Sequence, residues 1–152
     1  MPQTDDVTIL PLRPEDETLW RDLWHGYLTF YKTQLPESVY DATFARLTSD
    51  DVPDMQGMVA VVDGVPVGLA HYIFHRHCWR TGDVCYLQDL YATPAMRGRG
   101  LGRKLIEAVY TAADAAGVSQ VYWMTQADNH TARQLYDRVG TLTDFIKYQR
   151  PA

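Results

Sequence analysis

The segment from residue 97 to residue 104 combines alternate glycines with clustered cations. Its glycines are Gly98, Gly100 and Gly102. Its cations are Arg97, Arg99, Arg103 and Lys104. A glycine-rich turn ahead of a helix exposes unpaired N–H groups to an anion, and the helix dipole is positive there. Cations at this end are unfavourable unless a bound polyanion offsets them, so the sequence predicts a phosphate-containing ligand.

Two common phosphate-binding motifs do not fit this segment. A dinucleotide fingerprint needs a third glycine where Arg103 stands. A nucleoside triphosphate loop needs Gly-Lys-Ser/Thr, but Gly102 is followed by Arg103 and Lys104. The remaining alternatives are another phosphate ligand and a plain surface turn with incidental arginines.

Alternating strand and helix signals surround the loop. Strands are predicted over 7–10, 58–62, 65–74, 84–92, 120–125 and 142–148. Helices are predicted over 14–32, 38–47, 101–116 and 131–139, with a loop over 48–56. Asp63-Gly64 is a strong hairpin signal between two of the strands. This order predicts an α+β or mixed α/β domain with a central sheet, extending over residues 1–152.

Composition narrows the class of protein. Of the 152 residues, 46% are hydrophobic and 22% are charged, which is typical of a soluble globular protein. No apolar run is long enough for a membrane helix. The net charge of −5 argues against general nucleic-acid binding. Cys78 and Cys85 show neither metal-ligand nor disulfide spacing, so we expect reduced thiols and a cytoplasmic location.

Three segments together resemble the GNAT superfamily of N-acetyltransferases. Residues 97–102 match its Gln/Arg-x-x-Gly-x-Gly/Ala pyrophosphate loop, residues 87–94 resemble its fourth strand, and residues 129–136 match its Asn-x-x-Ala-x-x-Leu-Tyr helix. The aromatic first helix and residues 122–125 are similar to the histone-and-polyamine acetyltransferase subgroup. The resemblance implies a mostly antiparallel twisted sheet of about six to seven strands, splayed between strands 4 and 5 and flanked by about four helices.

The resemblance implies acetyl-CoA as the co-substrate. Its pyrophosphate would lie on the backbone of the loop, with the nearby arginines assisting. Its pantetheine arm would pair with the main chain of Leu90 and Ala92, and Tyr91 would point towards the acetyl group. Asn129 would contact the same arm, cap the following helix, or do both. The expected cofactor-binding loop residues are Arg97, Gly98, Arg99, Gly100, Leu101, Gly102 and Arg103.

Amine attack on a thioester needs an oxyanion donor and a proton for the leaving thiolate. Tyr136 matches the family tyrosine that protonates the thiolate; the alternative is that it only packs between helix and sheet. A backbone N–H near Leu90 or Tyr91 is the expected oxyanion donor. Gln88 cannot act as a base, so Asp89 is the candidate, either as a base through water or in a structural ion pair.

Aromatic residues are the candidate walls of the acceptor pocket. Tyr27 and Tyr31 lie on the first helix, which walls this pocket in the family, and Trp123 would lie near the splay. The alternative is that the aromatic stripe of the first helix is ordinary core. Aromatic walls suit an amine-bearing ligand because they attract cations.

The expected activity is transfer of an acetyl group to a primary amine by direct attack in a ternary complex. The acceptor could be a polyamine, a small amine or amino acid, or a lysine of a basic peptide. The alternative is a non-catalytic acyl-CoA sensor of the same fold. No metal is expected, because His71, His75 and His77 share a strand face without a carboxylate. A homodimer formed through residues 142–148 is also expected.

Overall fold

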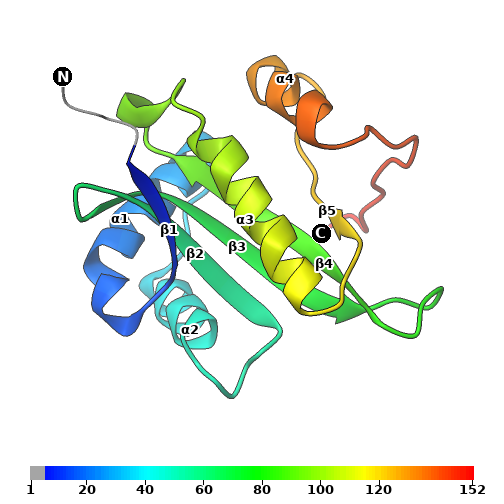
Figure 1. The fold of residues 1–152 in the computed structure, drawn as a ribbon, viewed down its shortest axis with the longest axis horizontal. Coiled ribbons are helices and arrows are strands. Elements are labelled where there is room, and N and C mark those ends of the chain that lie inside the picture. Colours follow the sequence, from blue (N-terminus) through cyan, green and yellow to red (C-terminus); the bar gives the residue numbers. More distant parts are fainter. Residues whose placement is uncertain (1–5) are drawn as a thin grey trace.

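The computed structural model describes residues 6–152 as one five-stranded sheet with helices on both faces (Figure 1). The strands are β1 (Val7–Pro11), β2 (Met55–Val62), β3 (Val65–Arg76), β4 (Asp83–Ala92) and β5 (Val121–Tyr122). The helices are α1 (Glu17–Phe30), α2 (Glu37–Leu47), α3 (Leu101–Ala115) and α4 (His130–Val139), with short 3-10 turns η1 (Pro14–Asp16) and η2 (Pro94–Met96). The predicted mixed α+β class with four helices is confirmed.

The strands lie side by side in chain order. β1 to β4 are antiparallel neighbours, and β5 runs parallel to β4. The turn between β2 and β3 uses Asp63 at φ 52° and Gly64 at φ 78°, the left-handed pair that a tight hairpin requires. The parallel step from β4 to β5 needs a crossover, and α3 provides it.

The pairing of β4 with β5 is short. It joins Cys85 to Val121 and Tyr86 to Tyr122. Beyond Tyr86, within residues 6–152, the same edge of β4 has no strand partner. The two parallel strands therefore separate halfway along β4, which confirms the predicted splay between strands 4 and 5.

Each face of the sheet carries its own apolar cluster. α3 and α4 cover one face, where Leu105, Ile106 and Val109 are fully buried. α1 and α2 cover the other, where Trp20 and Leu69 are fully buried. Alternate side chains of β2 and β3 enter opposite clusters, as the two-residue period of a strand requires.

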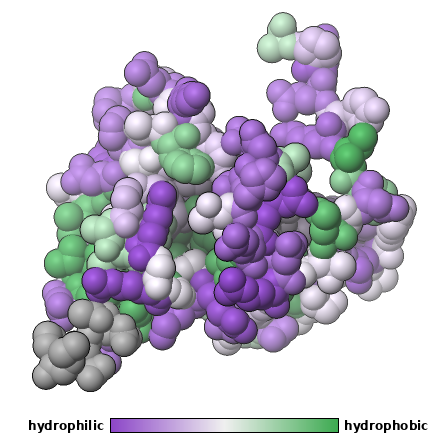
Figure 2. All heavy atoms as spheres, turned by 90° about the horizontal axis from the view of Figure 1, so that it is seen from above, coloured by the Kyte–Doolittle hydropathy of each residue, from purple (hydrophilic) through white to green (hydrophobic). Residues whose placement is uncertain are grey.

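The predicted number of strands is too high. The last predicted strand, residues 142–148, forms no regular structure, and the strand predicted over 120–125 is reduced to Val121–Tyr122. A strand needs a partner for its backbone groups, and residues 141–152 have none within the described chain. Figure 1 draws this red segment as coil without a strand arrow, and Figure 2 shows a narrow arm that projects from the body of the molecule.

Several element boundaries differ from the sequence prediction. α1 ends at Phe30, not near Lys32, because Lys32 adopts a left-handed φ of 55°. β2 begins at Met55, inside the predicted loop, because it pairs with Ile73. α4 begins at His130, one residue early. None of the helices described over residues 6–152 has the length and apolarity needed to cross a membrane.

Candidate active site

The glycine-rich loop joins the end of β4 to the start of α3. Gly98 and Gly100 adopt φ values of 80° and 78°, which side chains rarely tolerate, and Gly100 is the N-cap of α3. The first turn of α3 has no acidic residue, so its unpaired N–H groups meet no anion from their own helix. Leu101 is 2% exposed and anchors the helix start in the core. The loop therefore has the shape and charge expected of a phosphate cradle.

The arginines of the loop have different surroundings. The Arg97 guanidinium lies 5.6 Å from the ring centre of Phe30 and 5.9 Å from that of Tyr91. Its Nε also donates to the carbonyl of Ala92 at 3.4 Å. Arg103 instead pairs with Glu107 one turn along α3, at 3.4 Å. Arg97 thus connects the end of α1 to the end of β4.

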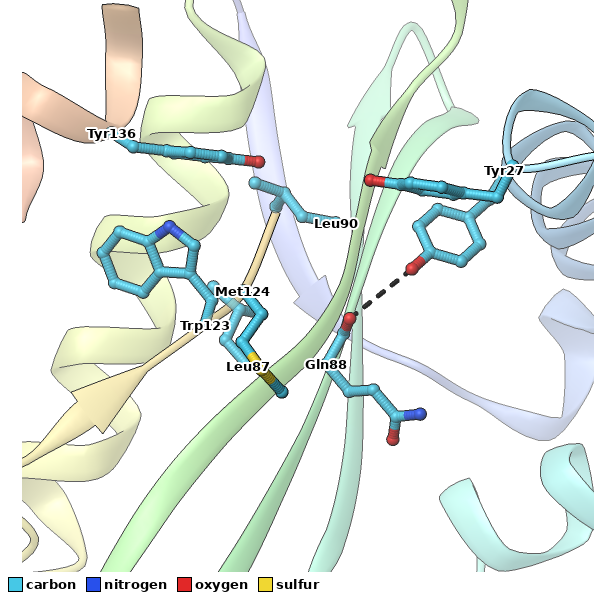
Figure 3. Close-up of a pocket in the computed structure, with 8 residues that line it drawn as sticks. Tyr27, Leu87, Gln88, Leu90, Trp123, Met124 and Tyr136 are labelled. Atoms are coloured by element: carbon cyan, nitrogen blue, oxygen red, sulfur yellow. Dashed lines mark hydrogen bonds between the residues drawn. The ribbon is translucent and has the colours of Figure 1, made fainter. Parts of the chain in front are cut away.

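A small hollow opens where β4 and β5 separate (Figure 3). Tyr136 from α4 and Trp123 after β5 stand on one side of it, and Tyr27 from α1 stands on the other. Side chains of β4 lie between them. The lining residues are Tyr27, Tyr31, Leu87, Gln88, Leu90, Trp123, Met124 and Tyr136. The structure therefore brings together five residues that the sequence assigned to this site.

A β-bulge shapes the wall that β4 contributes. His71 pairs with Asp89 and Tyr72 pairs with Leu87, so Gln88 has no residue opposite it on β3. The extra residue turns backbone groups away from the ladder, and the Tyr27 hydroxyl donates to the Gln88 carbonyl at 3.5 Å (Figure 3). The bulge thereby links the first helix to the strand beside the pocket.

Tyr136 lies on the pocket face of α4. Its ring meets Trp123 edge to face, with 5.6 Å between centres. Gly140 permits this packing, because a Cβ there would lie 2.8 Å from the Trp123 ring. Burial, with a smaller effect from Tyr31, raises the pKa of Tyr136 to about 12. The hydroxyl is therefore protonated at neutral pH and available as a donor.

Asp89 lies next to the pocket but does not line it. It is 7% exposed and accepts hydrogen bonds from His71 Nδ1 at 2.8 Å and Trp24 Nε1 at 3.2 Å. Burial favours a higher pKa for this carboxyl, but the interaction with His71 and smaller contributions from Tyr27 and Trp24 outweigh it, and the pKa is lowered. A carboxylate with these partners holds its charge and takes up a proton reluctantly.

Two predicted contacts are arranged differently in the structure. The side chain of Asn129 does not cap α4; its Nδ2 donates to Thr125 Oγ1 at 3.1 Å. Tyr91 does not line the hollow; it packs on α1, where its hydroxyl leaves no room for a Cβ at Gly26. Side chains alternate across a strand, so Tyr91 and Leu90 face opposite sides of β4.

Comparison with known proteins decides the family. Residues 18–141 match the model of the acetyltransferase (GNAT) family. The chain belongs to this GNAT family. It is 40% identical over 148 residues to the D-amino-acid N-acetyltransferase HPA3 of Saccharomyces cerevisiae, covering 96% of this chain and 91% of that protein. These matches support acetyltransferase activity.

Other GNAT proteins match in part of the sequence or in fold. Thialysine N-epsilon-acetyltransferase of Bos taurus is 35% identical over 74 residues, which span 49% of this chain and 43% of that protein. The aminoglycoside N-acetyltransferase AAC(6')-Iy, whose structure contains CoA, superposes with a TM-score of 0.84 at 19% identity, covering 99% of this chain and 98% of that one. The overall arrangement is therefore that of other GNAT proteins.

Sequence reasoning missed the partners of Asp89. From sequence, Trp20 and Trp24 belong to the aromatic stripe of the first helix, for which ordinary core is the alternative, and His71 is considered only in the context of metal binding. The structure joins Trp20 to His71 at 2.9 Å and both His71 and Trp24 to Asp89. A signal was present, since His71 and both tryptophans carry N–H groups that need partners when buried.

Proposed function

We propose that this GNAT protein transfers the acetyl group of acetyl-CoA to the primary amine of a small, amino-acid-like molecule. The neutral amine nitrogen would attack the thioester carbonyl directly in a ternary complex, the C–S bond would break, and the thiolate would take the proton of Tyr136. The proton lost by the amine nitrogen would pass to water, and water would return a proton to the Tyr136 phenolate. The observation that carries this proposal is the position of Tyr136 at a hollow beside the unpaired edge of β4.

The cofactor would bind along the path from β4 to α3. Backbone N–H groups of residues 99–102 would hold the pyrophosphate, with Arg97 and Arg103 beside it and Gly98 allowing close approach. The pantetheine amides would pair with Leu90 and Ala92 at the free edge of β4. Asn129, between β5 and α4, would contact the same arm.

A raised pKa is compatible with Tyr136 as the acid. Desolvation raises the pKa of Tyr136, and it also raises that of a thiol whose thiolate forms in the same site. The difference in pKa between Tyr136 and the thiol in the site is therefore smaller than the difference calculated with a free thiol, whose pKa is about 8.5. The contacts of Asp89 favour a fixed charge over the proton-accepting role considered from sequence.

The names of two similar proteins favour a small acceptor. Their acceptors, D-amino acids and thialysine, are small amines. We therefore place amino acids ahead of a polyamine or a protein lysine.

An acceptor screen tests this function. The protein is mixed with acetyl-CoA and D-amino acids, L-amino acids, thialysine, spermidine or a lysine-containing peptide, and acetylated product is measured by mass spectrometry. Thiol reagents are avoided because Cys78 is exposed. We expect turnover with at least one amino-acid amine. Tight CoA binding without any acetylated product would instead support the acyl-CoA sensor.

We also propose that the protein is a homodimer joined through residues 141–152. This segment exposes large apolar side chains, and β5 lies at the edge of the sheet with one strand neighbour. The exposed side chains are Leu142, Phe145, Ile146 and Tyr148. A partner's segment could complete the sheet beyond β5 and cover these residues.

A further inference from the structure

Asp89 is a buried charge with neutral partners. Its side chain is 10% exposed, and among the described residues the one basic side chain within ion-pair distance is His71, whose Nδ1 lies 2.8 Å away. No lysine or arginine of residues 6–152 approaches it within ion-pair distance. Buried carboxylates are costly unless a cation or several hydrogen bonds compensate them.

His71 is a neutral imidazole. Trp20 Nε1 lies 2.9 Å from His71 Nε2, and an indole nitrogen can only donate, so Nε2 must be the acceptor. The single ring proton is therefore on Nδ1, which donates to Asp89. A second proton on Nε2 would point towards the indole N–H of Trp20, and two donors repel each other. The unit formed by Trp20, His71 and Asp89 consequently carries one negative charge.

Tyr27 connects this charge to the pocket. It lines the hollow, and its pKa is raised mainly by burial and further by the charge and hydrogen bonding of Asp89. The Tyr27 hydroxyl lies 3.5 Å from the carbonyl of Gln88, the residue before Asp89. Tyr27 therefore stands beside both the hollow and the part of β4 that carries the carboxylate. None of the lining residues is charged, and four of the eight are aromatic. Aromatic faces attract cations, so the aromatic wall and the nearby carboxylate both favour a positively charged ligand.

Resting on the proposed function, we propose that the acceptor binds as an ammonium cation whose charge faces Asp89 across Tyr27. The positive charge that the described chain does not supply at Asp89 then comes from the acceptor. In this arrangement His71 is a positioning residue, because it holds the carboxylate through Nδ1–H and is itself oriented by Trp20. Asp89 determines the charge of the ligand that the pocket accepts.

A pair of non-reactive probes tests the inference without acetyl transfer. Choline carries a quaternary ammonium group whose nitrogen cannot be acetylated. Its neutral carbon isostere, with carbon in place of nitrogen, has the same shape without the charge. Both are titrated into the nitrogen-15-labelled full chain with CoA present, and the indole N–H signals are followed. Trp24 and Trp123 report on the site, and Trp79, which is 84% exposed, is the internal control.

We expect choline to shift the Trp24 and Trp123 signals and to bind at least about tenfold more tightly than the isostere, a ratio equal to about 1.4 kcal/mol. In Asp89→Asn this preference should disappear, while the retained Trp20 signal shows that α1 is still packed. Equal binding of the two probes to the wild-type chain overturns the inference, and so does a folded Asp89→Asn chain that keeps the preference.

If Asp89→Asn does not fold, the comparison of the two probes on the wild-type chain still tests the inference. The experiment also distinguishes failure of the cation site from failure of the proposed function. A chain that acetylates amines but binds both probes equally retains the function and overturns the cation site. A chain that prefers choline but acetylates no amine supports the cation site and overturns the function.

Discussion

The indole N–H of Trp20 donates to Nε2 of His71 at 2.9 Å, so a residue of α1 determines which nitrogen of a β3 histidine carries the proton. The other nitrogen then donates to Asp89 on β4. One chain of hydrogen bonds thus crosses from the helix that walls the pocket to the strand expected to hold the cofactor. The site consequently depends on how α1 docks on the sheet as well as on the residues that line the hollow.

His71 can be tested with two substitutions of different hydrogen-bonding capacity. His71→Asn keeps an N–H near the Nδ1 position, whereas His71→Leu removes it. Because a hydrogen bond to a charged group contributes about 1.5–3 kcal/mol, we expect the Leu variant to raise KM for the acceptor about tenfold or more above that of the Asn variant. Steady-state kinetics with varied amine measure this, and KM for acetyl-CoA should be similar in both. Equal acceptor KM values would mean that His71 is only a packing residue.

Tyr136→Phe tests the acid. General acid catalysis contributes about a hundredfold or more, so we expect kcat to fall by about this factor. The dissociation constant for CoA, measured by calorimetry, should stay unchanged because the ring remains. Tyr110→Phe is a matched control: its hydroxyl donates to the Val139 carbonyl, so its loss affects the packing of α4 but not the chemistry. Unchanged kcat in Tyr136→Phe would exclude the assigned role.

The pH dependence of kcat follows from the same group. The pKa of Tyr136 is raised to about 12, so its protonated, active form persists to higher pH than that of a free phenol. The acceptor ammonium loses its proton as pH rises, which favours attack. We therefore expect kcat to rise between about pH 7 and pH 10 without a decline caused by Tyr136. A reversible decline centred below about pH 10 in the wild type, but absent from Tyr136→Phe, would contradict this.

Substitutions at two glycines with the same φ angle distinguish an effect on cofactor binding from an effect of backbone strain. Gly100 in the loop and Gly64 in the β2–β3 turn both have φ 78°, and neither has an atom near the position of a new Cβ. Valine should strain the backbone by about 1–3 kcal/mol at either position. We expect Gly100→Val alone to weaken CoA binding by at least about tenfold, because its side chain would obstruct the anion. Comparable loss of CoA affinity in Gly64→Val would show that strain, not the loop, is responsible.

Local patterns were the predictable part of this protein. The strand before residue 97, the alternate glycines and the helix after them are neighbours in sequence, and each element favours its own conformation without help from the rest of the chain. The helix carrying Tyr136 was predictable for the same reason. The position of Tyr136 opposite Tyr27 could be expected only from the fold implied by the resemblance. Neither segment by itself indicates how far apart the two side chains lie.

Contacts that depend on register could not be read from sequence. Trp20 and His71 are 51 residues apart, and their meeting depends on how α1 lies across β3. His71 and Asp89 are opposite each other because of the bulge at Gln88, which no turn residue signals. The strand predicted at 142–148 had suitable residues, but a strand also needs a neighbour, and that neighbour is not part of the described chain.

The C-terminal segment gives the last prediction. Phe145 and Ile146 are 80% and 77% exposed, and an exposed apolar pair of this size is typical of an interface. We expect sedimentation to show a dimer of the full chain and Phe145→Asp/Ile146→Asp to sediment as a monomer, because two buried carboxylates would lack partners. Trp79→Asp is the matched control, since Trp79 is 84% exposed but lies in the β3–β4 turn. A monomeric wild type, or an Asp pair that leaves the dimer intact, would show that these side chains do not form the interface.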